Sequence, residues 1–170
     1  MKIRFAKMED VPALVELGRA IHAVTRFKQF EFKPERVVGN LTAVIQDKRG
    51  IYCFLVAEDA SGKAVGGLVG CLERHVFSDQ MVATLVHYDV LPEKRMGGAG
   101  LRLLTAFRRW AENRGAFELS AGISSGTDLN KMDRFMRRLG FELTGGNYSL
   151  MLEAPKQQNL PVQPSASASA

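Results

Sequence analysis

Two spacings of hydrophobic residues alternate along this chain, one typical of α-helices and one typical of β-strands. Apolar residues three or four positions apart predict amphipathic helices over residues 8–24, 34–46, 101–111 and 129–139. Short apolar or alternating runs predict strands over residues 2–6, 51–58, 64–73, 80–90, 117–121, 141–144 and 147–152. A chain that mixes the two patterns in this way belongs to the α/β class, here of the α+β type.

The strand expected over residues 80–90 carries polar side chains among its apolar ones. Because side chains alternate between the two faces of a strand, this segment is expected to divide into two sets. One set is Thr84, Val86, Tyr88 and Val90, and the other is Leu85, His87 and Asp89.

The length of 170 residues and an apolar content of 46% suit one domain with a single core. We expect this domain to span residues 1–153, followed by a disordered, low-complexity tail over 154–170. No apolar run approaches the ~20 residues of a membrane span, and the N-terminus lacks a secretory apolar segment. The expected location is therefore the cytoplasm, with Cys53 and Cys71 as buried free thiols.

The most informative stretch is residues 90–101, where a strand runs through a glycine-rich turn into a helix. Glycine lets the backbone turn tightly and approach a ligand closely. The first N–H groups of a helix lack intrahelical partners and lie at the positive end of its dipole. We therefore expect this turn to bind a phosphate or pyrophosphate. A P-loop is excluded because Leu101 follows Gly100, and a dinucleotide fingerprint is disfavoured by Leu103.

The net charge of +5 is concentrated around this turn. Residues 93–114 contain six Lys or Arg and two Glu, and residues 131–138 contain four Lys or Arg and one Asp. Such a field attracts a polyanionic ligand, although a solvated helix face explains part of the same charge. No interleaved aromatics or basic tail accompany it, so nucleic acid is disfavoured as a partner.

Arg95, Gly98 and Gly100 form the pattern Arg-x-x-Gly-x-Gly after a strand ending in Val-Leu-Pro. This arrangement resembles the acyl-CoA motif of the GNAT superfamily of N-acetyltransferases. Residues 3–10 look like the first strand and acidic helix start of that family, and residues 130–141 look like its asparagine-bearing helix. The resemblance implies a mixed, mostly antiparallel sheet of about seven strands with about four helices. It also implies that strand 80–90 is splayed from strand 117–121.

The resemblance further implies acetyl-CoA as the cosubstrate. Main-chain groups of Tyr88, Asp89 and Val90 are expected to pair with its pantetheine arm, and one amide is expected to polarise the thioester carbonyl. Asn130 is expected near the pantetheine or the thiol, with Phe135 packed beside it. The backbone expected to hold the pyrophosphate is that of Arg95, Met96, Gly97, Gly98, Ala99 and Gly100.

The proton-transfer groups are less well defined. Met136 stands where the family often has a tyrosine that protonates the departing thiolate, and methionine cannot do so. Tyr88 is a candidate acid, and His87 and Glu73 are candidate bases. Each has a structural alternative: Tyr88 as a core residue, His87 as a structural histidine, and Glu73 as a solvated carboxylate at a strand end.

The expected function is therefore transfer of an acetyl group from acetyl-CoA to a primary amine, by direct attack within a ternary complex. The alternative is a CoA-binding domain of the same fold without efficient catalysis, acting as a sensor or interaction module. The acceptor is expected to be a small-molecule or peptide amine, and the sequence does not select among polyamines, aminoglycosides, peptide N-termini and lysine side chains. No metal is expected, and a homodimer is left open.

Overall fold

The computed structural model describes residues 1–126 and 128–152 of the chain, in which five strands form one mixed sheet in the order β1-β2-β3-β4-β5. The first four strands are antiparallel neighbours, and β5 runs parallel to β4. The strands are β1 (Lys2–Phe5), β2 (Tyr52–Glu58), β3 (Ala64–Arg74), β4 (Met81–Val90) and β5 (Ala116–Ala121). The α-helices are α1 (Val11–Val24), α2 (Pro34–Ile45), α3 (Ala99–Asn113) and α4 (Leu129–Arg138). The mixed α+β sheet and the four helices confirm the predicted class.

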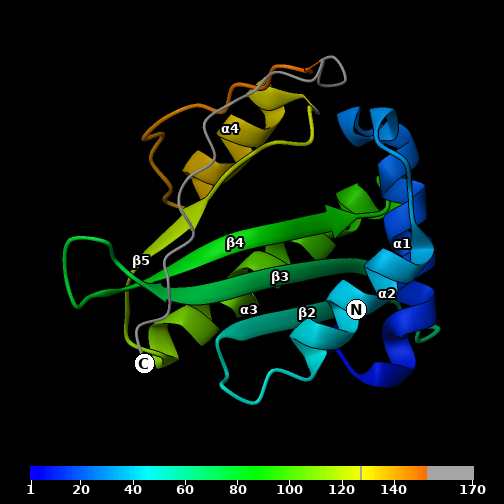
Figure 1. The fold of residues 1–170 in the computed structure, drawn as a ribbon, viewed down its shortest axis with the longest axis horizontal. Coiled ribbons are helices and arrows are strands. Elements are labelled where there is room, and N and C mark those ends of the chain that lie inside the picture. The colour runs from blue at the N-terminus through cyan, green and yellow to red at the C-terminus, as the bar shows by residue number, and fades with distance from the viewer. Residues whose placement is uncertain (127, 153–170) are drawn as a thin grey trace, which may run out of the picture.

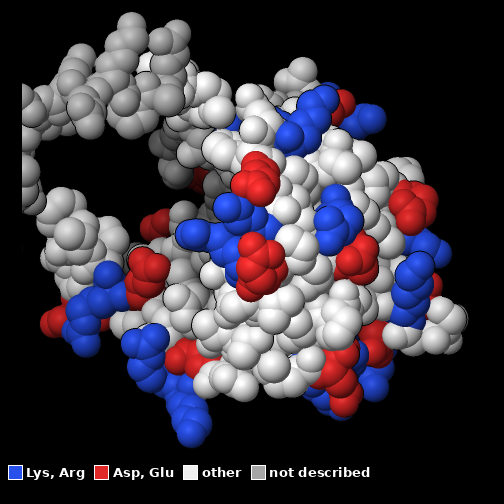
Figure 2. Space-filling model, turned by 45° about the vertical axis from the view of Figure 1, so that its right-hand side comes forward, with Lys and Arg blue, Asp and Glu red and all other residues white. Residues whose placement is uncertain are grey.

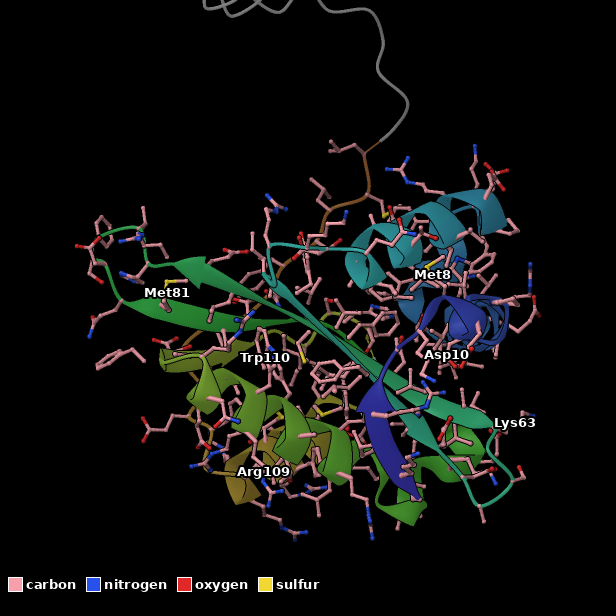
Figure 3. The ribbon with its side chains drawn as sticks, turned by 90° about the horizontal axis from the view of Figure 1, so that it is seen from below. Met8, Asp10, Lys63, Met81, Arg109 and Trp110 are labelled. Atoms are coloured by element: carbon pink, nitrogen blue, oxygen red, sulfur yellow. The ribbon has the colours of Figure 1, made fainter. Side chains whose placement is uncertain are left out.

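Helices cover both faces of the sheet (Figure 1). On one face α3 packs along the strands, and its buried Leu103 and Phe107 join the larger core together with Met136 from α4. On the other face Leu14, Leu17 and Ile21 of α1 form a second core with β2 and β3. Figure 3 shows how α3 is divided, with Trp110 between the helix and the sheet and Arg109 on the side away from it.

Two glycines of β3 allow α3 to lie close against the sheet. A Cβ at Gly70 would overlap the ring of Phe107, which is fully buried. A Cβ at Gly66 would meet Asp89 O at 2.9 Å and the side chain of Leu103 at 3.3 Å. The absence of side chains here therefore sets the separation between α3 and the sheet. It also fixes where the start of α3 lies relative to β4.

A β-bulge interrupts β4 in the middle. Val69 pairs with His87 but the next residue, Gly70, pairs with Leu85, so Val86 is the extra residue of β4. An extra residue reverses the alternation of side chains beyond it. The expected division of this strand is consequently wrong, because Leu85 packs with Tyr88 and Val90 on the face covered by α3. His87 and Asp89 lie on the opposite face, together with Thr84, because each is directly opposite a β3 residue of that face.

The pairing of β4 with β5 ends at the bulge. The parallel register runs from Met81 opposite Ala116 to Leu85 opposite Ala121, and within the described residues no strand continues it beside residues 86–90. Bulges increase the local twist of a strand, which directs the second half of β4 away from the path of β5. The strands are therefore splayed, as predicted.

The expectation of seven strands is wrong for the described residues, where five are present. Residues 141–144 and 147–152 were expected as strands but have no strand pairing in the structure. Their apolar side chains are largely exposed, with Leu143 and Leu150 at 70% and 82%. A two-stranded hairpin that buries no apolar face is at best marginally stable in water. The predicted tail, residues 154–170, lies outside the described residues.

Candidate active site

A cleft of about 170 Å³ occupies the space where β4 and β5 separate. Its walls come from the second half of β4, from the segment that follows β5, and from one side of α4. A further residue, Phe27, comes from the short 3-10 helix η2 (Arg26–Gln29), which follows α1. The lining residues are Phe27, Leu85, Val86, His87, Tyr88, Asp89, Ala121, Gly122, Ile123, Ser124, Ser125, Met132 and Met136.

This cleft is lined by residues from both faces of the sheet. Tyr88 and Met136 approach it from the face covered by α3 and α4, where both contribute to the larger core. His87 and Asp89 approach it from the α1 face, since they pair with Val69 and Gly67. Groups from both faces of the sheet therefore meet at this cleft.

The glycine-rich turn stands at the start of α3. Residues Pro92–Gly97 form the 3-10 helix η3, and Gly98 then adopts a positive φ of 76° before α3 begins at Ala99. A 3-10 helix uses some of its own N–H groups in i→i+3 bonds, whereas the first turn of α3 has no side-chain cap. A Cβ at Gly98 would meet nothing within 4 Å. There is thus open space beside Gly98, while Ala99 and Gly100 are buried. An uncapped helix start with open space beside it fits a phosphate.

Tyr88 and Arg95 lie beside this first turn. A Cβ at Gly100 would overlap the hydroxyl of Tyr88, so this hydroxyl lies directly against the helix start. Arg95 Nε donates a hydrogen bond to Val90 O at 3.2 Å, which holds the guanidinium near the end of β4. Burial raises the pKa of Tyr88 to about 12, while the charge of Arg95 acts in the opposite direction. Tyr88 is therefore a neutral hydroxyl at physiological pH.

His87 and Asp89 form a hydrogen-bonded pair that lines the cleft. His87 Nε2 bonds to Asp89 Oδ2, and the side chains are 60% and 15% exposed. This hydrogen bond raises the pKa of His87 above its ordinary value, against the smaller opposing effect of desolvation. Alternation along the strand already placed both residues on one face, and the bulge at Val86 removes Leu85 from that face. The contact between the two side chains was not predicted.

Arg26 is a structural element of the cleft that sequence reasoning missed. Its backbone N–H donates to Ser125 O at 3.1 Å, and its Nε donates to Ser124 O at 2.5 Å. A terminal nitrogen also donates to Ser149 Oγ at 3.1 Å. Arg26 therefore joins η2 to the segment after β5, on the far wall from β4. An isolated arginine in a link between helices carries no sequence signal for such a role.

The other predicted residues lie in several different places. Glu73 accepts a hydrogen bond from Cys71 Sγ at 3.1 Å and pairs with Val82 at the other end of β4, outside the cleft lining. Phe135 packs against the larger core, while Asn130 is exposed near the start of α4. Met96 is 99% exposed at the turn. Met136 does line the cleft, so the wall holds a thioether at the position where the family often has a tyrosine hydroxyl.

The two cysteines lie on neighbouring strands, Cys53 on β2 and Cys71 on β3. Cys53 and Cys71 are free and buried, as predicted, and burial raises the pKa of each thiol to about 12. Thiols of this kind stay protonated and are poor nucleophiles.

Among residues 1–126 and 128–152 there is no group of three or more side chains placed to hold a metal ion. Within the same residues, none of the helices is both long and apolar enough to cross a membrane.

The basic residues near the site are partly paired with acids. On α3 and α4, Arg108 bonds to Glu112 at 2.8 Å and Arg137 to Asp133 at 2.9 Å, each across one helical turn. On the face that carries α1 and α2, basic and acidic side chains are interspersed (Figure 2). Exposed pairs of this type reduce the local field. Arg95, which donates to a main-chain carbonyl, keeps its charge beside the glycine turn.

Residues 19–141 match the Acetyltransferase (GNAT) family, and the chain belongs to this family. None of the curated proteins matches the chain in sequence.

Solved structures share the fold at low sequence identity. A transcriptional regulator from Bacillus halodurans C-125 superposes with a TM-score of 0.74 at 19% identity, over 89% of this chain and 99% of that one. AAC(6')-Iy, in complex with the bisubstrate analog CoA-S-monomethyl-acetylneamine, gives 0.70 at 18% identity, over 90% and 98%. The aminoglycoside 6'-N-acetyltransferase AAC(6')-Ih from Acinetobacter baumannii gives 0.68 at 16% identity, over 91% and 99%. These neighbours support the fold. Sequence identities this low do not identify a substrate.

Proposed function

We propose that this protein transfers an acetyl group from acetyl-CoA to a primary amine by direct attack within a ternary complex. The observation that carries the proposal is the cleft between β4 and the segment after β5, which is lined from both faces of the sheet. Tyr88 connects this cleft to the start of α3, where there is open space beside Gly98. A long, phosphorylated thioester needs an anion site at one end and a channel for its arm. The acceptor needs a second entrance, which the α1 face provides.

The start of α3 would hold the pyrophosphate. Gly98, Ala99 and Gly100 supply the main chain at the uncapped first turn, and Arg95 supplies a cation beside it. The remaining backbone of Arg95, Met96 and Gly97 belongs to η3, so its share of the contacts is smaller than the sequence alone suggested. This set fits a phosphate because it combines helix-start N–H groups with one guanidinium.

The second half of β4 would hold the pantetheine arm and orient the thioester. Tyr88, Asp89 and Val90 lie beyond the end of the β5 ladder, and the first two of them line the cleft. A backbone amide from this edge would stabilise negative charge on the thioester oxygen. The rest of the acceleration comes from holding the amine and the thioester together. Asn130 and Phe135 remain proposed contacts near the arm, on α4.

The acceptor amine would enter from the α1 face, between η2 and β4. There it meets Phe27, His87 and Asp89, an aromatic ring beside an imidazole and a carboxylate. An aromatic face and a carboxylate both attract ammonium groups. The structural neighbours that act on aminoglycosides make this class of amine the first to test, beside polyamines and peptides.

A second candidate function is a CoA-binding domain without efficient transfer. Met136 favours it, because this residue lines the cleft without a proton to give. The two candidates agree on the binding of acetyl-CoA and differ only in whether CoA is released when an amine is present.

The test is a titration with acetyl-CoA followed by a thiol-release assay over an amine panel. The panel contains a polyamine, an aminoglycoside, a peptide with a free N-terminus and an N-blocked lysine peptide. We expect acetyl-CoA to bind and at least one amine to release CoA thiol in proportion to acetylated product. Binding without release on every amine would establish the binding domain instead. Absence of binding would reject both.

A further inference from the structure

In residues 86–90 two side chains meet for which the sequence predicts different roles, His87 as a candidate base and Asp89 as a main-chain contact. His87 and Asp89 stand two positions apart on one face of β4, after the bulge and beyond the end of the β5 ladder. Their side chains meet through His87 Nε2 and Asp89 Oδ2, and both line the cleft. The carboxylate is the more buried partner, so it supports the more exposed ring from behind.

This contact fixes the proton on the ring. A carboxylate accepts hydrogen bonds and cannot donate them, so Nε2 must carry the hydrogen. The lone pair of the neutral imidazole is then on Nδ1. Hydrogen bonding at one ring nitrogen sets the chemistry of the other in this way.

The surroundings leave Asp89 as the charged group that faces His87. The β3 residues opposite the pair are Val69 and Gly67, and Leu17 and Ile21 of α1 pack with Val69 in the second core. Across the cleft lie Phe27 of η2 and Ser124 and Ser125 after β5. Of the two cations of η2, Arg26 directs its guanidinium to Ser124 O and Ser149 Oγ, and Lys28 is not among the residues that line the cleft. Among the described residues, the charge that acts on His87 therefore comes from its own strand.

We propose that Asp89 is a positioning residue that orients His87 as the proton carrier of the transfer reaction, in place of a hydroxyl at position 136. This inference rests on the proposed acetyl transfer. It identifies a base and an acid within one side chain, where the sequence offered three separate candidates.

The proton transfers balance within the cleft. The nitrogen of a neutral amine forms a bond to the thioester carbonyl carbon, and His87 Nδ1 accepts the proton that this nitrogen must lose. The carbon–sulfur bond then breaks, and the electron pair leaves with sulfur. His87 returns the same proton to the thiolate, which gives the amide, the CoA thiol and a neutral imidazole. Asp89 stabilises the imidazolium between the two steps, and Met136 has no proton to supply.

The decisive variant is Asp89→Asn, which keeps the shape of the side chain and removes its charge. The chain has three histidines, so the ring signals of His87 can be assigned by NMR with the help of His87→Gln. We expect the titration midpoint of His87 to move to lower pH in Asp89→Asn, because the hydrogen bond that raises the pKa of His87 loses its charge. This measurement needs no substrate, so it remains informative if the amine acceptor is wrong.

The pH dependence of kcat/KM should follow the titration midpoint of His87. His87 accepts a proton only when neutral, so kcat/KM falls as pH drops below its pKa. In Asp89→Asn this acidic limb should move to lower pH together with the NMR midpoint. On the plateau kcat should fall about 10-fold to 100-fold, since an asparagine amide also permits the unproductive tautomer. The control is Asp79→Asn, which removes the same charge from an exposed pair with Arg74 at the far end of β4.

Asp79→Asn should leave both the midpoint and the acidic limb in place. An unchanged His87 midpoint in Asp89→Asn would overturn the inference, and so would a midpoint that moves without the acidic limb. Loss of turnover in Glu73→Gln with full turnover in His87→Gln would assign the base to β3 instead. A wild-type protein that binds acetyl-CoA but releases no thiol defeats the proposed function itself, and that result is obtained before any variant is made.

Discussion

The two halves of β4 have the same backbone conformation and opposite environments. Residues 81–85 pair with β3 on one edge and β5 on the other, and Ala83 is fully buried. Residues 86–90 pair with β3 alone among the described strands, and their other edge borders the cleft. Val86, the bulge residue between the halves, is 56% exposed. One extra residue therefore separates a strand that builds the core from a strand that builds the site.

The comparison teaches that packing and function depend on different features of neighbouring residues. In the first half, the buried side chains stabilise the fold, and the main-chain N–H and C=O groups are hydrogen-bonded to β3 and β5. In the second half, no described strand pairs with the edge that borders the cleft. The bulge also shifts which face the side chains point to, so that the hydrogen-bonded pair of His87 and Asp89 lines the cleft. Changes in the first half should alter stability, and changes around the second half should alter binding or rate.

The largest expected effect is at Gly98, which precedes α3 and lies outside both halves of β4. Gly98→Val should weaken acetyl-CoA binding at least about 100-fold, or about 2.8 kcal/mol. The new side chain would project into the open space beside the first turn of α3, and a β-branched residue at φ 76° would distort that turn. Isothermal titration calorimetry of the folded variant measures the change.

The matched control is Gly62→Val in the β2–β3 turn. Gly62 also has a positive φ, of 81°, and a Cβ there also meets open space. Both variants should lose a similar amount of stability, on the order of 1–2 kcal/mol from backbone strain. Gly62→Val should keep its affinity. Equal affinities in the two variants would show that the start of α3 does not bind the cosubstrate.

The next effect is at Gly70 of β3, which pairs with Leu85 in the first half of β4. Gly70→Ala should lower the free energy of unfolding by about 1–3 kcal/mol, because the added methyl overlaps the buried ring of Phe107. Gly39→Ala in α2 is the control, since nothing lies within 4 Å of a Cβ there, and it should be neutral or stabilising by up to about 1 kcal/mol. Denaturant unfolding of both variants compares them. Equal stability of the two would mean that α3 lies further from β3 than the structure indicates.

Much of this architecture was predictable from sequence because it follows from local patterns. The spacing of Leu104, Phe107 and Ala111 predicts α3, and the glycines after Val90 predict the turn that precedes it. The first five strands and the splay were also predicted correctly. The strands expected within residues 141–152 are absent, because an alternating apolar pattern gives a local preference and does not specify the long-range pairing that a strand needs. Among the described strands the edge strand β5 has a free edge, and these residues do not pair with it.

The site was predictable in its backbone and not in its side chains. The bulge at Val86 depends on how β4 pairs with β3, which is a long-range register. Without it, alternation places Leu85 with His87 and separates both from Tyr88. The contact of Arg26 with Ser124 joins residues 98 positions apart, and no local pattern carries that information.

A smaller effect, at Tyr88, distinguishes a role in cosubstrate binding from a role as the acid. In Tyr88→Phe we expect the Kd for acetyl-CoA to rise about 5-fold to 10-fold, the loss of about one hydrogen bond. The reason is that the hydroxyl lies against Gly100 at the start of α3, with Arg95 nearby. Turnover at saturating acetyl-CoA should be nearly unchanged. A fall in kcat at constant Kd would instead return Tyr88 to the role of acid, which the sequence also allowed.

The smallest effect concerns the wall opposite β4, at Arg26. Arg26→Ala removes the guanidinium bonds to Ser124 O and Ser149 Oγ but keeps the backbone bond to Ser125 O. The wall therefore loosens without detaching, and the KM for the amine should rise about 3-fold to 5-fold, equivalent to about 1 kcal/mol. The Kd for acetyl-CoA should not change, because its proposed sites are on α3 and β4. Initial rates at varied amine concentration test this, with Arg19→Ala on α1 as a charge-matched control whose side chain contacts Glu16 and Phe32. If Arg26→Ala weakens acetyl-CoA binding and leaves the KM for the amine unchanged, the amine does not enter beside η2, and the two entrances of the cleft must be exchanged.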